Sequence, residues 1–186
     1  MGVRMIDMNV AVRYCSLHGN TKAIAEEIAE AVGVEAVSIN DEPELKEYVD
    51  VLFLGGAPYW SIMDPALEEY AKNLQPSMVG TVVLFTTSNW SRRTAIGLRD
   101  IFEKRGITVA PGHFYAHMSQ IQQRKNAARE FAKSTVAALE KSNNVSKNTG
   151  LIPELKTEAV TVGAIGVGVV LIITALAMVF RKRRYV

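Results

Sequence analysis

Short apolar runs alternate along residues 8–141 with segments in which apolar residues recur every three or four positions. An unbroken apolar run is typical of a strand covered on both faces, and the longer spacing is typical of a helix with one buried face. The predicted strands are Val10–Val12, Val34–Ser38, Val51–Gly56, Val82–Phe85, and a last strand formed by Thr108–Val109 with Phe114–Tyr115. The predicted helices are Thr21–Val32, a short one at Glu44–Tyr48, one that begins at Pro65, one that ends near Gly106, and Gln122–Leu139.

Strands that alternate with helices in this way imply right-handed crossovers and an α/β fold with a doubly wound parallel sheet. Ligands of such sheets bind beyond the carboxyl ends of the strands, where the strand order reverses. The loops predicted at that edge begin at Cys15, Ala57 and Thr86. We therefore expect the functional site to lie between these three loops.

The first loop, Ser16–Thr21, joins an apolar strand to an amphipathic helix. Small, hydroxyl-bearing and glycine residues at such a junction let backbone N–H groups converge, and the helix dipole adds roughly half a positive charge there. A phosphate group would fit this point. The alternative is a plain turn in which Asn20 or Thr21 caps the helix.

The second and third loops carry aromatic residues, namely Tyr59 and Trp60 in one and Trp90 in the other. FMN would account for all three loops, because it combines a phosphate with a flat ring on which aromatic side chains can stack. Backbone amides of Thr87–Asn89 are expected to contact the pyrimidine edge of that ring. The alternative for each aromatic residue is ordinary packing in the core or at an interface.

The spacing Ser16-x-x-Gly19-Asn20-Thr21 resembles the phosphate loop of flavodoxins, usually Ser/Thr-x-Thr-Gly-x-Thr, with departures at Leu17 and His18. The resemblance covers residues 8–141. It implies a flavodoxin-like five-stranded parallel sheet of order 2-1-3-4-5, bound FMN, electron transfer between protein partners and no dedicated substrate pocket. The expected cofactor-binding residues are Ser16, Leu17, His18, Gly19, Asn20, Thr21, Pro58, Tyr59, Trp60, Ser61, Thr87, Ser88, Asn89 and Trp90.

His18 is the most informative departure, because an imidazole can donate to a phosphate directly and become cationic beside it. A solvent-facing histidine that only covers the loop is the alternative. His113 and His117 are not expected to hold a metal, because no carboxylate or cysteine clusters with them in the sequence. The single cysteine, Cys15, excludes an internal disulfide and a cysteine-ligated cluster within one chain.

Charge is divided unevenly along the chain, although the whole sequence carries a formal net charge of only +2. Residues 1–70 hold 4 basic and 13 acidic side chains, whereas residues 71–147 hold 12 basic and 4 acidic ones. Such a dipolar domain can orient a charged partner, although solvated faces account for most surface charge. The basic residues are not interleaved with aromatic residues along a recognisable reader, so we expect no nucleic-acid partner.

The carboxyl-terminal part differs in composition from residues 1–142. A polar linker is expected at 143–158, and residues 159–180 contain no charged side chain, which is long enough to cross a hydrocarbon core of about 30 Å. A basic tail follows at 181–186. The sequence therefore predicts a single transmembrane helix at the carboxyl end, with a weak homodimer possible through its small residues.

Two features of the sequence give conflicting indications of the side of the membrane on which the domain lies. The basic tail favours a cytoplasmic carboxyl terminus, which would place the domain outside. The amino terminus shows no apolar stretch suited to export, and for that reason we expect a cytoplasmic domain.

The sequence thus predicts a membrane-tethered FMN electron carrier that acts between redox proteins. An FMN-dependent NAD(P)H quinone or iron reductase is the first alternative, and direct flavin reduction by NADH or NADPH would favour it. A structural subunit that keeps the fold without the cofactor is the second, and a purified protein without flavin absorption would favour that.

Overall fold

The structure is a computed structural model, and it describes residues 8–60 and 62–148 of the 186-residue chain. The main sheet is parallel, with strand order β2-β1-β3-β6, and both β7 and β8 pair with the far side of β6. Its strands are β1 (Val10–Tyr14), β2 (Ala36–Ser38), β3 (Val49–Gly56), β6 (Val79–Ser88), β7 (Thr108–Val109) and β8 (Phe114–His117). Because β7 and β8 together fill the fifth position, the predicted order 2-1-3-4-5 and the interrupted last strand are confirmed.

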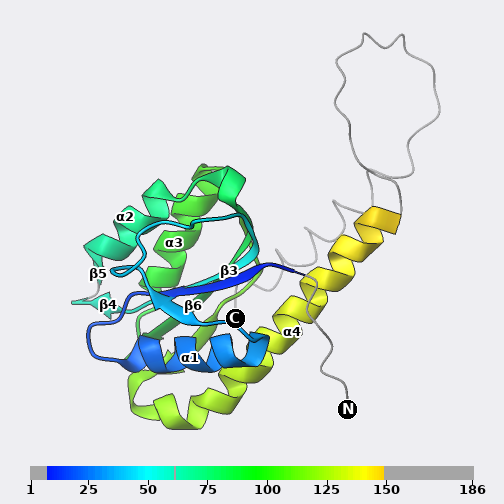
Figure 1. Cartoon of the computed structure of the whole chain (residues 1–186). Helices are drawn as coiled ribbons and strands as arrows, with labels where there is room; N and C mark the ends of the chain where they lie inside the picture. Colours follow the sequence, from blue (N-terminus) through cyan, green and yellow to red (C-terminus); the bar gives the residue numbers. More distant parts are fainter. Residues whose placement is uncertain (1–7, 61, 149–186) are drawn as a thin grey trace, which may run out of the picture. The chain divides into compact units, whose positions relative to one another are not determined.

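Helices cover both faces of this sheet, with α1 and α4 on one side and α2 and α3 on the other (Figure 1). The helices are α1 (Asn20–Val32), α2 (Pro65–Asn73), α3 (Arg93–Lys104) and α4 (Ile121–Asn148), with short 3-10 turns η1 (Pro76–Met78) and η2 (Met118–Gln120). A small antiparallel hairpin, β4 (Pro58–Tyr59) with β5 (Ile62–Met63), stands apart from the main sheet. The α/β doubly wound fold class is confirmed for this part of the chain.

The central strand β3 shows how the sequence builds two cores. Val51 and Phe53 pack into the cluster beneath α1 and α4, whereas Leu52 and Leu54 belong to the cluster beneath α2 and α3. All four side chains are fully buried. Successive side chains of a strand point to opposite faces, so an unbroken apolar run is required where both faces are covered.

Local signals fix the ends of α1 and α2. Helix α1 ends at Gly33, whose φ of 77° is easily adopted by glycine and whose N–H bonds the carbonyls of Ala29 and Glu30. Helix α2 begins at Pro65 after Asp64, whose carboxylate accepts the N–H of Ala66 at 2.9 Å. Both boundaries agree with the sequence prediction.

Three predictions about local structure are wrong. Residues 44–48 form no helix, and a single turn there would gain little from the core, to which only Leu45 contributes. Helix α4 continues past Leu139 to Asn148, because no glycine or proline interrupts that stretch, so residues 143–148 of the expected linker are helical. The loop predicted from Ala57 to Asp64 contains the β4–β5 hairpin.

The expected remainder of the linker, the transmembrane helix at 159–180 and the basic tail at 181–186 lie outside the described residues. Among the helices that the structure does describe, none combines the length and the apolar character that a membrane crossing needs.

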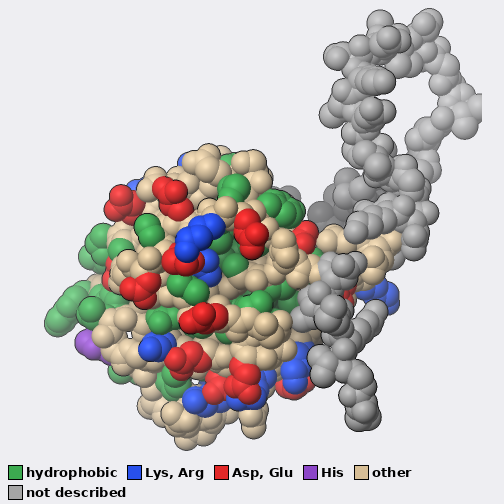
Figure 2. All heavy atoms as spheres, in the orientation of Figure 1, with side chains coloured by type: hydrophobic (Ala, Val, Ile, Leu, Met, Phe, Trp, Pro, Cys, Tyr) green, Lys and Arg blue, Asp and Glu red, His purple; other side chains and the backbone are tan. Residues whose placement is uncertain are grey.

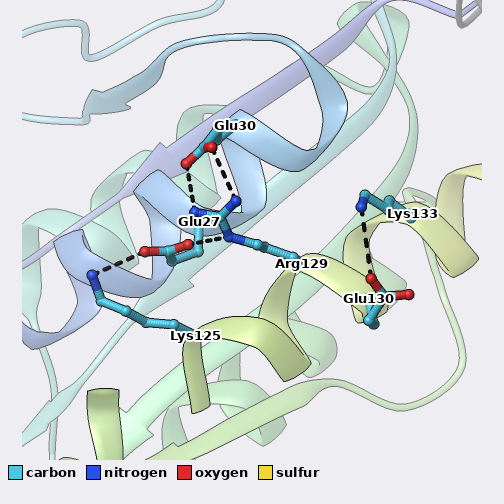
Figure 3. Close-up of polar contacts among 6 residues, drawn as sticks. All are labelled: Glu27, Glu30, Lys125, Arg129, Glu130 and Lys133. Carbon is cyan, nitrogen blue, oxygen red and sulfur yellow. Dashed lines mark hydrogen bonds and ion pairs between the residues drawn. The ribbon is translucent and has the colours of Figure 1, made fainter. Parts of the chain in front are cut away.

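A group of charged side chains joins α1 to α4, the two helices that cover one face of the sheet (Figure 3). Arg129 bonds Glu27 through Nε and reaches Glu30 with two hydrogen bonds of 2.9 and 2.7 Å, while Lys125 lies 2.9 Å from Glu27. Burial alone would raise the pKa of the Glu27 carboxyl, but hydrogen bonds and charges from Lys125 and Arg129 outweigh it and lower the pKa. The pair of helices is therefore held by a carboxylate that stays ionised at neutral pH.

Replacement of Glu27 by glutamine is expected to lower the free energy of unfolding at pH 7 by about 1–3 kcal/mol, since hydrogen bonds to charged groups are lost and water partly screens them. The folded-state pKa of Glu27 is lowered, so its contribution is present above the unfolded-state pKa and disappears as the pH falls through the folded-state pKa. Urea unfolding of both proteins from pH 7 downward should show the difference shrinking. Glu130→Gln, which alters the exposed pair with Lys133 also drawn in Figure 3, should change stability far less; an equal effect would contradict the account.

Candidate functional site

A cavity of about 460 Å³ opens at the carboxyl edge of the sheet, next to the strands β1, β3 and β6. Its lining residues are Ser16, His18, Asn20, Thr21, Ala57, Pro58, Tyr59, Trp60, Thr87, Ser88, Asn89, Trp90, Ser91 and Met118. None of these lining residues is acidic, so nothing in the wall repels an anion. The cavity lies where strand order reverses between β1 and β3, which is the expected ligand position in a doubly wound sheet.

The loop Ser16–Thr21 turns directly into α1. Gly19 adopts φ 82°, a left-handed conformation that suits glycine, and its N–H donates to Ser16 Oγ at 3.1 Å. No side chain caps α1. The first backbone N–H groups of the helix are therefore not taken by a capping side chain, and the positive end of the helix dipole faces the loop.

A hydroxyl pair connects this loop to the neighbouring strand β6. Thr21 Oγ1 lies 2.8 Å from Thr87 Oγ1, and both residues are almost fully buried. The contact joins the first turn of α1 to the carboxyl end of β6. Two of the three walls of the cavity are consequently fixed relative to each other.

The β4–β5 hairpin forms the second wall, and its two aromatic residues differ in their surroundings. The Tyr59 hydroxyl accepts the N–H of Leu17 at 2.7 Å, and burial raises the pKa of this phenol. Trp60, at the tip, is 97% exposed and has φ 52°, which is unusual for a bulky residue. Tyr59 thus holds the hairpin against the first loop, whereas the indole of Trp60 is left free.

Figure 2 shows hydrophobic side chains protruding from the molecule at the edge where Figure 1 places β4 and β5. The exposed large side chains of this region include Leu17, Trp60 and Ile62, each at least 68% exposed. A left-handed Trp60 costs about 1–2 kcal/mol relative to a relaxed backbone. Strain of this kind tends to persist where a ligand is held.

The third wall follows β6. Ser88 Oγ donates to the carbonyl of Ser91 at 2.7 Å, and the Tyr115 hydroxyl donates toward the carbonyls of Ser88 and Asn89. Trp90 is 87% exposed, and its ring lies 5.0 Å from that of His117 in an edge-on arrangement. Hydrogen bonds therefore hold the backbone of this loop in place, while most of the Trp90 indole stays exposed, as the Trp60 indole does in the hairpin.

The structure brings most of the residues expected from the sequence into this one cavity. Leu17 does not line it, because its side chain is 69% exposed and only its N–H is engaged, and Gly19 contributes the turn rather than a wall. Ser61 lies outside the described residues. Sequence reasoning missed Ala57, Ser91 and Met118.

Met118 was the residue that the edge rule could have found, because it directly follows the carboxyl end of β8. Cys15, just before the first loop, is buried, and burial followed by the nearby charge of Asp64 raises the pKa of its thiol to about 12. The thiol is thus protonated at neutral pH and acts as a small packed side chain.

Replacement of Tyr59 by phenylalanine is expected to leave the Leu17 N–H without its partner and to speed hydrogen exchange of that amide about fivefold, since such a bond contributes on the order of 1 kcal/mol. The Asn40 amide, which donates to Ser38 Oγ away from the hairpin, serves as the internal control. Exchange at Leu17 that does not change relative to Asn40 would mean that Tyr59 does not hold the hairpin to the loop.

No protein-family model and no curated protein sequence matches this chain. Solved structures with a similar fold include oxidised flavodoxin 2 from Bacillus cereus, which is 17% identical with a TM-score of 0.52 over 68% of this chain and 99% of that chain. A short-chain flavodoxin associated with a non-canonical PDU bacterial microcompartment is 16% identical, with a TM-score of 0.56 over 71% of this chain and 99% of that one.

A Fusobacterium nucleatum flavodoxin mutant, bound to flavin mononucleotide in its crystal structure, is 16% identical with a TM-score of 0.55, covering 70% of this chain and 96% of that chain. These similarities show that the chain has the flavodoxin-like fold.

Proposed function

We propose that this chain binds one FMN in the cavity at the carboxyl edge of its sheet and carries electrons between redox proteins. The observation that supports this most directly is the convergence on one cavity of an uncapped helix start and of two exposed indoles from separate loops. Flavodoxins, with which the chain shares its fold, are represented by structures with FMN bound.

The phosphate would lie against the loop Ser16–Thr21. Backbone N–H groups at the start of α1 can donate to it, and the helix dipole favours negative charge there. His18 lines the same wall and is exposed. Its imidazole can donate a hydrogen bond to the phosphate and, when protonated, can also add a positive charge, which a neutral side chain cannot. The absence of acidic residues among the lining residues fits an anionic group.

The flat ring would lie between the hairpin and the loop after β6. Trp60 and Trp90 expose nearly their whole side chains to water. Stacking on a flavin ring would shield one face of each indole from water. Asn89 directly follows β6 and lines the cavity, and its N–H is in none of the loop backbone hydrogen bonds of the described residues. It is therefore available to the polar edge of the ring. Bound FMN would supply the redox centre, while these residues orient it and exclude water.

Comparison of FMN with riboflavin tests where the phosphate lies. The full chain, titrated by quenching of flavin fluorescence, is expected to bind FMN at least about 100-fold more tightly than riboflavin, since several charge-assisted hydrogen bonds depend on the phosphate. His18→Gln should weaken FMN binding and leave riboflavin binding unchanged. Equal affinities for the two flavins would contradict the phosphate assignment, and an absence of binding of either would contradict the function.

Stopped-flow mixing separates the carrier from the reductase. A carrier bound to FMN is expected to show slow flavin reduction by NADH or NADPH alone and rapid reduction once a flavoprotein reductase is added as electron donor. Rapid reduction by either nucleotide alone would instead favour an enzyme with small substrates.

The proposal includes a membrane tether and a cytoplasmic domain, and the uncharged run at 159–180 with the basic tail after it supports the tether. Membrane fractionation of cells expressing the full chain or a chain that stops at residue 158 tests the tether. The full chain should remain in the membrane pellet after a carbonate wash, and the shorter chain should not.

The redox partner is expected to present an acidic surface, because Arg92 and Arg93 are both exposed beside the third loop.

A further inference from the structure

A second cavity, of about 500 Å³, shares Trp90 with the first. Its lining residues are Trp90, Arg92, Tyr115, His117, Ser119 and Gln120. Of these six residues, Trp90 is the one that also lines the first cavity. The volume falls within the range of about 300–1,000 Å³ that is common for small-molecule sites. No acidic side chain is among these lining residues, so this cavity too favours an anion.

Arg92 provides a positive charge that is held in place but not neutralised. Its guanidinium lies 5.7 Å from the centre of the Tyr115 ring, and Tyr115 is itself held by its hydroxyl, which lies 3.1 Å from the carbonyl of Ser88. Within the described part of the chain, none of the ion pairs includes Arg92. The planar donor group of an arginine suits a carboxylate, which it can bind through two parallel hydrogen bonds.

His117 adds a donor without an acceptor. Its Nδ1 lies 2.8 Å from Ser119 Oγ and 3.3 Å from the backbone nitrogen of Ser119. A backbone N–H can only donate, so we assign Nδ1 as the acceptor and the proton of the neutral ring to Nε2. Nε2 is buried and has no hydrogen-bond partner among the described residues. Burial of an unsatisfied donor is unfavourable, and an acceptor that reached it would remove this penalty.

Trp90 lies beside the ring of His117 and is itself loosely held. Its ring lies 5.0 Å from the ring of His117, at an interplanar angle of 69°, and its side chain is 87% exposed. Little packing therefore opposes a small shift of the indole. Together with the Tyr115 ring, the indole offers an aromatic surface beside the two donors.

We propose that this second cavity binds a small planar anion, an aromatic carboxylate, with the carboxylate at Arg92 and His117 and the ring against the indole of Trp90. Ser119 and Gln120 supply further polar groups at the same wall. The site is distinct from the proposed FMN cavity and does not require FMN. Trp90 lines both cavities, so an occupant of this one would contact the same indole as a flavin bound in the first.

The test uses 4-hydroxybenzoate as the probe and the uncharged 4-hydroxybenzamide as its matched control. The chain has two tryptophans, so the full chain with Trp60→Phe leaves Trp90 as the only indole reporter. The acid is expected to change the fluorescence of Trp90 in a saturable way. The Kd of the amide should be higher than that of the acid by a factor of about ten or more. Arg92→Gln should raise the Kd of the acid about tenfold and leave that of the amide unchanged.

Two further variants locate the probe. Arg93→Gln removes the neighbouring charge, which does not line the cavity, and His18→Gln alters the wall of the first cavity; both should keep the Kd of the acid within about twofold of the parent. Equal weakening by Arg92→Gln and Arg93→Gln would show unspecific attraction and overturn the proposal. Weakening by His18→Gln, or no saturable binding at all, would also overturn it. Because flavin is removed from the chain before this titration, failure here is separate from a failure to bind FMN.

Discussion

Alanine at both Trp60 and Trp90 is expected to weaken FMN binding by about 100-fold, since each aromatic stack on a flat heterocycle contributes about 1–3 kcal/mol. Both side chains are almost entirely exposed, at 97% and 87%, so their removal should leave the stability of the fold unchanged. Riboflavin affinity should fall by the same factor, because the ring and not the phosphate is affected. Fluorescence titration of the double variant with each flavin measures both effects.

Ile96→Ala is the matched control for this double variant. Ile96 is a large hydrophobic residue that is 65% exposed on α3, and it does not line the cavity. Its replacement should leave FMN affinity unchanged. A double tryptophan variant that binds FMN within about threefold of the parent would show that the two indoles do not hold the ring, and the proposed placement of FMN would be wrong.

Replacement of Gly55 by alanine is expected to lower the free energy of unfolding by about 3 kcal/mol, at the upper end of the usual range for overpacked cores. A Cβ atom at Gly55 would lie 2.1 Å from the Cε2 atom of Phe85, which is fully buried. Gly55 pairs with Tyr14 on one side and Phe85 on the other, so neither neighbouring strand can withdraw. Urea unfolding of the variant measures the loss.

Gly106→Ala serves as the control, because a Cβ atom there meets nothing within 4 Å and only the φ of 74° is unfavourable. Its effect should be about 1–2 kcal/mol. Phe85→Leu combined with Gly55→Ala should recover part of the loss by making room for the new methyl group. If Gly55→Ala is no more destabilising than Gly106→Ala, close packing is not the reason for glycine at position 55.

The fold could be predicted from the sequence because the two-sided burial of β3 and β6 leaves a direct mark in their apolar runs. The carboxyl-edge rule then brought Ser16–Thr21, Tyr59–Trp60 and Thr87–Trp90 to one place, since it depends on topology and not on side-chain detail. Glycine and proline marked the ends of α1 and α2 for the same local reasons that the structure shows.

The parts that could not be predicted depend on contacts between residues far apart in the chain. The β4–β5 hairpin has only two residues in each strand, too few for a pattern, and it is held by the bond from Leu17 to Tyr59. Gly55 and Gly56 end β3, where the absence of a Cβ atom makes room for Phe85 and Leu67 from distant parts of the chain. The tautomer of His117 likewise depends on a folded neighbour.

The central claim is that this chain is an FMN protein, and the visible absorption spectrum of the full chain tests it most directly. The purified chain, saturated with FMN and freed of excess flavin by desalting, is expected to retain one FMN per chain, measured from flavin absorption against protein concentration. A chain that shows folded α/β circular dichroism but retains no flavin absorption after this treatment would contradict the claim.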